Sequence, residues 1–162
     1  MTASEQAISE IGDPMVRELA TRGQVRAFPK NAVIINEGDR GDSLYVILTG
    51  KVKVYVSDDD GREMILDIYG PGDYVGEMAL DGRPRAASVM TLESSLCSLI
   101  SRPAVQQHLA QEPAFAMHLV TQVIRRENGV DTFAHVVARF PGFTYSGFTS
   151  MRIHPRQEVV FH

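Results

Sequence analysis

The sequence predicts a mainly β fold with flanking helices, in which antiparallel strands form a sandwich or barrel. Between residues 24 and 100, short β-branched runs alternate with glycine-containing turns, a spacing typical of antiparallel β folds. Val52, Val54 and Val56 alternate with more polar residues, so one face of that strand should be buried. Sequences with helical periodicity precede and follow this region. We therefore expect a β domain at residues 23–111 between helical segments.

The order of elements follows from the apolar periodicity and the turn signals. The N-terminal segment, residues 1–22, should hold a short amphipathic helix at about residues 5–20, which Gly12-Asp13-Pro14 would interrupt. A further short helix is expected at Arg102–Leu109. The eight expected strands are Val25–Phe28, Ala32–Ile35, Ser43–Leu48, Lys51–Ser57, Glu63–Tyr69, Tyr74–Val75, Ala87–Leu92 and Ser95–Ile100.

A longer helix is predicted within residues 112–140, because apolar residues recur every three to four positions from about Pro113. Such a stripe either packs on the β domain as core or forms a seam between two copies of the chain. We expect a homodimer through this helix. Residues 141–162 show no clear period and are expected to form an irregular tail. The residues assigned to the dimer stripe are Phe115, Leu119, Val123 and Ile124.

Composition limits the classes of function. The net charge of −4 argues against a general nucleic-acid-binding surface. The single cysteine, Cys97, excludes a disulfide framework and fits a reducing compartment. It lies in a strand-like run, so we expect a buried structural thiol. No signal peptide and no apolar run long enough to cross a membrane is found, so we expect a cytoplasmic protein.

The segment from Gly76 to Val89 carries the strongest chemical signal. It places Glu77 and Arg85 on a turn-rich stretch. The Arg85 guanidinium offers a planar fork of donors that fits phosphate oxygens, and a glutamate carboxylate accepts from sugar hydroxyls. Small residues beside them, Gly76 and the Ala86-Ala87 pair, let backbone N–H groups approach an anion. The alternative is a surface ion pair, but this placement of small residues favours a ligand carrying phosphate and hydroxyls.

Three segments together resemble the cyclic-nucleotide-binding domains of the catabolite activator (CRP/FNR) family and of protein kinase A regulatory subunits. They are residues 36–50, residues 69–80 and Pro84-Arg-Ala-Ala-Ser88, and the resemblance extends over roughly residues 10–139. It implies an eight-stranded antiparallel β-roll, or jelly roll, with a short N-terminal helix and a long C-terminal lid and dimer helix. It also implies a sensor that binds a cyclic nucleotide and needs no prosthetic group.

The resemblance assigns roles to the same residues. Glu77 would bind the ribose 2′-hydroxyl and Arg85 the cyclic phosphate, with backbone N–H groups of Gly76, Ala86 and Ala87 completing the phosphate site. Guanine-selective members of the family often carry Thr or Ser directly after the phosphate arginine. Ala86 occupies that position here, so we expect cAMP as the ligand, with cGMP as the alternative.

The chain departs from the family pattern in the loop Leu80-Asp-Gly-Arg-Pro84, which is on the short side, in the base contact and in the region after the long helix. The family's base contact comes from the long helix, where the nearest positions are Arg126 and Glu127, and these do not match the Thr-Ser pair of the catabolite activator. Bacterial regulators of this family continue into a helix-turn-helix, which needs two further helices and clustered basic residues. No such pattern is found in residues 141–162. We therefore do not expect this chain alone to bind DNA.

Two other functions remain to be weighed. A cupin-like enzyme would share the short-strand texture, but it needs histidines on the barrel strands to hold a metal. All five histidines follow the β region, and we expect His108 and His118 to be solvated helix residues. We therefore expect no metal site and no enzymatic activity. A degenerate roll that serves only protein–protein contact is the second alternative, against which the presence of both Glu77 and Arg85 argues.

Overall fold

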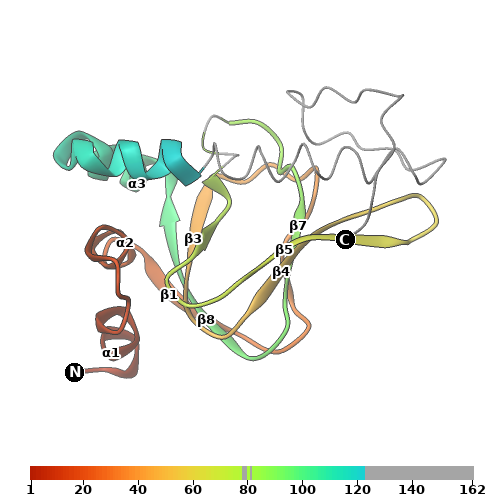
Figure 1. Ribbon diagram of the computed structural model, residues 1–162, viewed down its shortest axis with the longest axis horizontal. Helices are drawn as coiled ribbons and strands as arrows, with labels where there is room; N and C mark the ends of the chain where they lie inside the picture. The colour runs from red at the N-terminus through yellow and green to blue at the C-terminus, as the bar shows by residue number, and fades with distance from the viewer. Residues whose placement is uncertain (78–79, 81, 123–162) are drawn as a thin grey trace.

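Eight antiparallel strands form two four-stranded sheets in the computed structural model, which describes residues 1–77, 80 and 82–122 (Figure 1). The expected antiparallel β-roll is confirmed. The first sheet has the order β1 (Gln24–Phe28), β8 (Ser95–Ser101), β3 (Ser43–Thr49), β6 (Tyr74–Val75). The second has the order β2 (Val33–Ile35), β7 (Ser88–Thr91), β4 (Val52–Ser57), β5 (Glu63–Tyr69).

The expected strands all occur, and no strand end shifts by more than one residue. Strand β3 continues one residue further than expected, to Thr49. A register shift between Ile47 and Thr49 marks an irregularity against β8. The strand then turns at Gly50, whose φ of 95° lies in the left-handed region that glycine adopts without strain. Pattern reading located these strands correctly because each carries its own alternation and its own turn.

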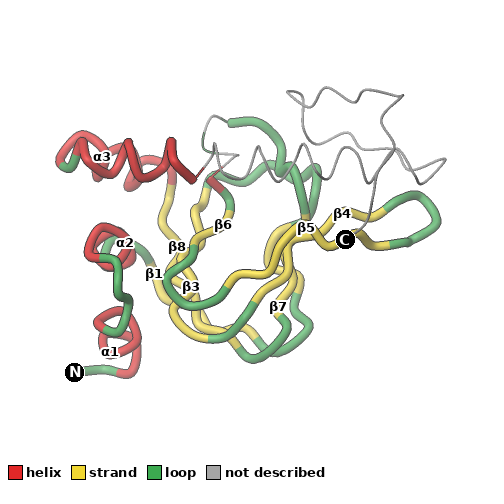
Figure 2. Tube along the Cα trace, viewed as in Figure 1, coloured by secondary structure: helices red, strands yellow, loops and turns green. Residues whose placement is uncertain are grey.

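The helices lie against the first sheet, on the left of Figure 2. They are α1 (Ala3–Ser9), α2 (Pro14–Ala20) and α3 (Arg102–Gln111). The expected break at Gly12-Asp13-Pro14 is confirmed: Pro14 stands in the first turn of α2, and the Asp13 carboxylate caps it by accepting the Met15 N–H at 2.9 Å. Residues 113–122 are also helical, and the expected continuation beyond them lies outside the described residues.

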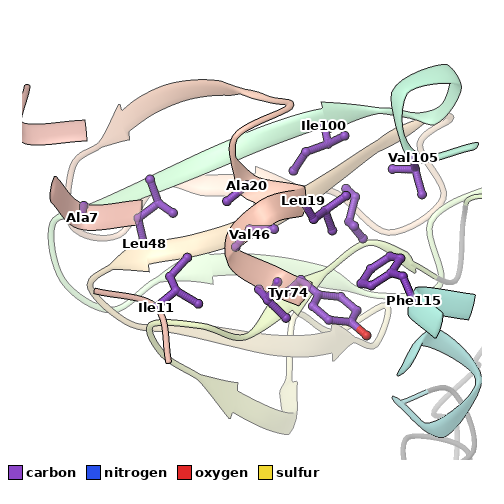
Figure 3. Close-up of a cluster of buried hydrophobic side chains, with 12 residues drawn as sticks. Ala7, Ile11, Leu19, Ala20, Val46, Leu48, Tyr74, Ile100, Val105 and Phe115 are labelled. Atoms are coloured by element: carbon purple, nitrogen blue, oxygen red, sulfur yellow. The ribbon is translucent and has the colours of Figure 1, made fainter. Parts of the chain in front are cut away.

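Strand β3 separates two hydrophobic cores because both of its faces are buried. Leu44, Val46 and Leu48 face the helices and pack with residues of α1, α2 and α3 (Figure 3). Ile47, on the opposite face, packs between the two sheets with Cys97 of β8. Burial raises the pKa of the Cys97 thiol to about 12, so it stays protonated and unreactive at neutral pH. The expectation of a buried structural thiol is confirmed.

Phe115 corrects the expected dimer stripe. Its side chain is 0% exposed within a single chain, and its ring contacts the rings of Tyr74 and His108. Leu119 is partly buried and packs on the same cluster. The first half of the stripe is therefore core of this chain, because the helix folds back on the roll. Val123 and Ile124 lie outside the described residues.

His108 also differs from its expected place. We expected a solvated side chain, yet it is 1% exposed, with its ring 5.0 Å from that of Phe115. Neither ring nitrogen has a hydrogen-bond partner among the described residues. Burial lowers the pKa of His108, and the charge of Arg22 lowers it further, although Glu18 and Glu112 act in the opposite direction. The folded state therefore favours the neutral imidazole.

The lowered pKa of His108 predicts a stability that falls in mild acid. Below its unfolded pKa of 6.5, the unfolded chain binds a proton that the folded chain resists, so the free energy of unfolding decreases as pH falls toward the folded pKa. We expect His108→Leu to show a shallower decrease between pH 7.5 and 5.5 in urea unfolding. The other histidines are common to both proteins, so their contribution cancels. Equal pH slopes for the two proteins would contradict this reading.

Candidate functional site

Two loops distant in sequence meet at Arg85. The backbone N–H of Arg85 donates to the carbonyl of Asp39 at 2.8 Å, and the Gly38 N–H donates to the Arg85 carbonyl, also at 2.8 Å. This reciprocal pair joins the loop before β3 to the segment that leads into β7. Because both hydrogen bonds use the main chain, they fix the position of Arg85 independently of neighbouring side chains.

The guanidinium of Arg85 is buried and held by main-chain carbonyls. The residue is 5% exposed. Its Nη1 donates to the carbonyl of Gly76 at 3.1 Å and its Nη2 to that of Ser43 at 2.8 Å. These bonds tie the side chain to the residue after β6 and to the first residue of β3. A buried cation thus lies between the edge of the first sheet and the turn that follows it.

Glycines on two sides make room for this guanidinium. A Cβ at Gly41 would lie 2.9 Å from Arg85 Nη2, and one at Gly76 would lie 2.7 Å from Nη1 and 3.0 Å from the Ser43 carbonyl. Gly76 also has a φ of 95°, which disfavours any residue with a side chain. A side chain is therefore disfavoured at Gly76 by its backbone conformation and by the Ser43 carbonyl, whereas at Gly41 a Cβ would have to push aside the end of the Arg85 side chain.

Glu77 brings a buried acid beside the buried base. It is 6% exposed, and its carbonyl accepts the Leu80 N–H at 3.2 Å, which makes the turn expected after it. Burial lowers the pKa of the Arg85 guanidinium, while electrostatic interactions with Tyr45, Asp42 and Glu77 raise it. The arginine remains a cation because its ordinary pKa is far above neutrality.

The structure brings together the residues that the sequence singled out. Gly76, Glu77 and Arg85 are adjacent in space, and Ala86 and Ala87 follow Arg85 as half-buried residues. The weak expectation of a base contact at Arg126 and Glu127 falls outside the described residues. Together these residues place a cationic fork of donors beside a carboxylate, which suits a small ligand with an anionic group and hydroxyls.

Sequence reasoning missed what holds the arginine. Ser43 contributes its main-chain carbonyl, and Gly38, Asp39 and Gly41 come from a loop about 45 residues before Arg85. The glycines of that loop were visible as turn signals, but its contact with Arg85 had no local signature. Among the described residues, no three or more His, Cys, Asp and Glu side chains group as a metal site. No described helix is long and apolar enough to span a membrane.

Comparison with known proteins identifies the family. The family model described as the cyclic nucleotide-binding domain matches residues 25–112, more than half of the sequence. The chain belongs to the cyclic nucleotide-binding domain family. It is 30% identical over 116 residues to the cAMP-activated global transcriptional regulator CRP of Salmonella typhimurium, covering 70% of this chain and 55% of that protein. The chain thus spans about half the length of the curated relatives it matches.

Solved structures of this family include regulators and an enzyme. The catabolite activator protein of Thermus thermophilus matches with a TM-score of 0.67 and 27% identity, over 82% of this chain and 66% of that one. The EAL enzyme Bd1971 in its cAMP-bound form matches with a TM-score of 0.53 and 31% identity, over 70% of this chain and 31% of that one. The chain is thus similar to part of a catabolite activator protein and to part of an EAL enzyme.

Gly76→Ala should test the close approach of Arg85. The new Cβ meets Nη1 and a carbonyl oxygen, and the positive φ adds strain, together roughly 1–3 kcal/mol of lost stability. Gly70→Ala is the matched control, because its Cβ would meet only the Gly50 carbonyl at 3.9 Å, and we expect a change within about 0.5 kcal/mol. Chemical denaturation measures both. Equal costs for the two variants would show that Gly76 is not constrained by the arginine.

Proposed function

We propose that this domain binds a 3′,5′-cyclic nucleotide, with Arg85 bonding the cyclic phosphate and Glu77 the ribose 2′-hydroxyl. The supporting observation is the buried Arg85 guanidinium, 5% exposed, beside the buried Glu77, 6% exposed. Main-chain N–H groups of Gly76, Ala86 and Ala87 would complete the phosphate contacts. No prosthetic group enters this proposal, and the chemistry is binding rather than catalysis.

The cost of burying two ionisable side chains argues against a degenerate interaction module. Removing a charge from water costs several kcal/mol unless partners compensate. The carbonyls of Gly76 and Ser43 and the charges of Asp42 and Glu77 compensate the Arg85 charge in part. A phosphate would add charge-assisted hydrogen bonds, which are about twice as strong as neutral ones. A roll used only for protein contact would gain nothing from keeping this arrangement, so ligand binding is the better explanation.

The relatives indicate what the domain would regulate. We propose that it is the sensing part of a CRP-type transcription regulator, since the regulator of Salmonella typhimurium named as cAMP-activated matches 70% of the chain. DNA binding by this chain alone is not part of the proposal, and residues 141–162 lie outside the described structure.

A homodimer through the helix that begins at residue 113 is also proposed, but on different residues from those expected. Met117 and Val120 are 67% and 48% exposed, and their three-residue spacing puts them on one side of the helix. They present apolar surface that faces away from Phe115, which the roll already covers. Light scattering at high micromolar concentration would read the mass, and a monomer with and without nucleotide would reject the dimer.

Arg85→Ala should weaken nucleotide binding at least about tenfold, since charged hydrogen bonds contribute roughly 1.5–3 kcal/mol each. Arg85→Lys should recover little, because an ammonium group cannot copy the planar fork. Isothermal titration with cAMP measures both. Arg26→Ala, on strand β1 and outside the site, is the control for removal of an arginine. Equal affinity for wild type and Arg85→Ala would refute the role of Arg85.

Preference for cAMP over cGMP is expected from Ala86, which has no hydroxyl to meet the guanine amino group. Ala86→Thr supplies that hydroxyl and should raise the affinity for cGMP relative to that for cAMP. The expected gain is that of one added hydrogen bond, about 0.5–1.5 kcal/mol. A competition assay with both nucleotides measures the ratio. If the wild type binds cGMP about tenfold more tightly than cAMP, a difference of about 1.4 kcal/mol in the opposite direction, the interpretation of Ala86 is wrong.

A further inference from the structure

Three side chains from separate elements form a continuous hydrogen-bonded network outside the proposed nucleotide site. His118 Nε2 lies 2.7 Å from Oδ2 of Asp13, and His118 Nδ1 lies 2.9 Å from the hydroxyl of Tyr74. Asp13 is the cap of α2, Tyr74 begins β6, and His118 stands on the helix that begins at residue 113. This network of Asp13, His118 and Tyr74 therefore connects the N-terminal helices, the first sheet and the C-terminal helix.

Asp13 determines which atoms of this network carry protons. Burial raises the pKa of the Asp13 carboxyl, but hydrogen bonds from His118 and the Met15 N–H, and the charge of His118, lower it by more. An ionised Asp13 can only accept, so His118 Nε2 carries a proton and donates. In the neutral ring Nδ1 then accepts from the Tyr74 hydroxyl. If the ring is protonated, Nδ1 donates to the phenol oxygen instead, so both bonds exist in either state.

Aromatic rings pack on the Tyr74 and His118 part of this network, so it differs from a catalytic triad, whose nucleophile must be accessible. Tyr74 is 2% exposed, and its ring lies 6.4 Å from that of Phe115 (Figure 3). The His118 ring stacks on Phe115 at 5.7 Å with an interplanar angle of 17°. A phenol hydroxyl in this position is closed to a substrate. His118, whose side chain is 16% exposed, was expected to be solvated and is instead a packed residue.

Tyr74 lies only two residues before Gly76, which touches the arginine of the site. Strand β6 holds two residues and pairs only with β3, through Tyr45–Val75 and Val46–Tyr74. So short an edge strand has few ladder bonds of its own. Main-chain bonds between Ile47 of β3 and the residues Gly72 and Asp73 hold the segment just before it. The hydroxyl bond to His118 adds a side-chain contact at its first residue, and the bond from Arg85 Nη1 to the Gly76 carbonyl adds another just after its last residue.

We propose that Asp13, His118 and Tyr74 form a latch that couples the position of the C-terminal helix to Arg85 through strand β6. His118 acts as a positioning residue: it touches neither the proposed phosphate nor the ribose group, but holds the strand that leads to them. A change at Arg85 shifts Gly76, the two-residue strand transmits the shift to Tyr74, and the latch transmits it to the helix at residues 113–122. This inference deepens the proposed function, since nucleotide contact with Arg85 would be the natural cause of such a change.

A double-mutant cycle without nucleotide tests the coupling itself. Amide hydrogen exchange at residues 113–122 is compared in wild type, Tyr74→Phe, Arg85→Ala and the double variant, with β8 amides as the reference for global stability. Tyr74→Phe keeps the ring and removes one hydrogen bond, so exchange should quicken about three- to tenfold. Arg85→Ala should also quicken it, and its effect should shrink below about twofold in the Tyr74→Phe background. Effects that simply multiply, or no response to Arg85→Ala, would overturn the latch.

Further variants keep this result interpretable. Asp13→Ser retains a good helix cap but cannot reach His118, and should behave like Tyr74→Phe. Tyr55→Phe removes a buried tyrosine hydroxyl from β4, in the other sheet, and should leave residues 113–122 unchanged relative to the reference. If Arg85→Ala does not fold, Gly41→Ala takes its place in the cycle, since its Cβ would displace the guanidinium.

A separate arm measures cAMP binding by titration and repeats the exchange with saturating nucleotide. If wild type does not bind, the proposed function fails while the cycle still decides the latch. If wild type binds and the cycle is non-additive, cAMP should alter protection at residues 113–122 in wild type and much less in Tyr74→Phe. An identical cAMP response in both proteins would reduce the latch to a structural role and refute the coupling.

Discussion

The buried guanidinium of Arg85 constrains the architecture around it. A cation that is 5% exposed must find acceptors at fixed positions, and two carbonyls from opposite sides of the site provide them. Ser43 can do so only because β3 begins there, and Gly76 only because it has no side chain. The reciprocal main-chain bonds between Arg85 and the loop at residues 38–39 then join the two connections. Three segments of the roll thus hold the single side chain of Arg85 in a fixed position.

The same three segments explain why the sequence predicted one half of the site and not the other. Gly76, Glu77 and Arg85 lie within ten residues, so their chemistry could be read from a single segment. The acceptors at Ser43 and Asp39 depend on which loops the antiparallel topology brings together, and no local pattern records that pairing. Side-chain identity carries no signal there either, because the contacts use the main chain.

The C-terminal helix shows a different limit. Periodicity correctly indicated that residues 113–122 form a helix with an apolar side, but it cannot say whether that side is covered by the same chain or by another. Phe115 lies in the core of its own chain at 0% exposure, while Met117 remains 67% exposed. His108 and His118 were expected in solvent because histidine is polar, yet ring packing on Phe115 places both at the joint between helix and roll. For His108 ring packing outweighs the polarity of the side chain, whereas His118 combines ring packing with hydrogen bonds to Asp13 and Tyr74.

The short strand β6 gives this arrangement its capacity to respond. A longer strand would hold Tyr74 and Gly76 by ladder bonds, and neither end would depend on side chains. The strand has two paired residues, and Ile47 bonds to Gly72 and Asp73 just before it. Arg85 and His118 add side-chain contacts at its two ends. A phosphate that competes for the Nη groups would exchange neutral carbonyl acceptors for charged ones, which relaxes the hold on Gly76. Since a ligand shifts an equilibrium only through contacts that differ between its states, this exchange would be the difference that the proposed latch passes on to the helix.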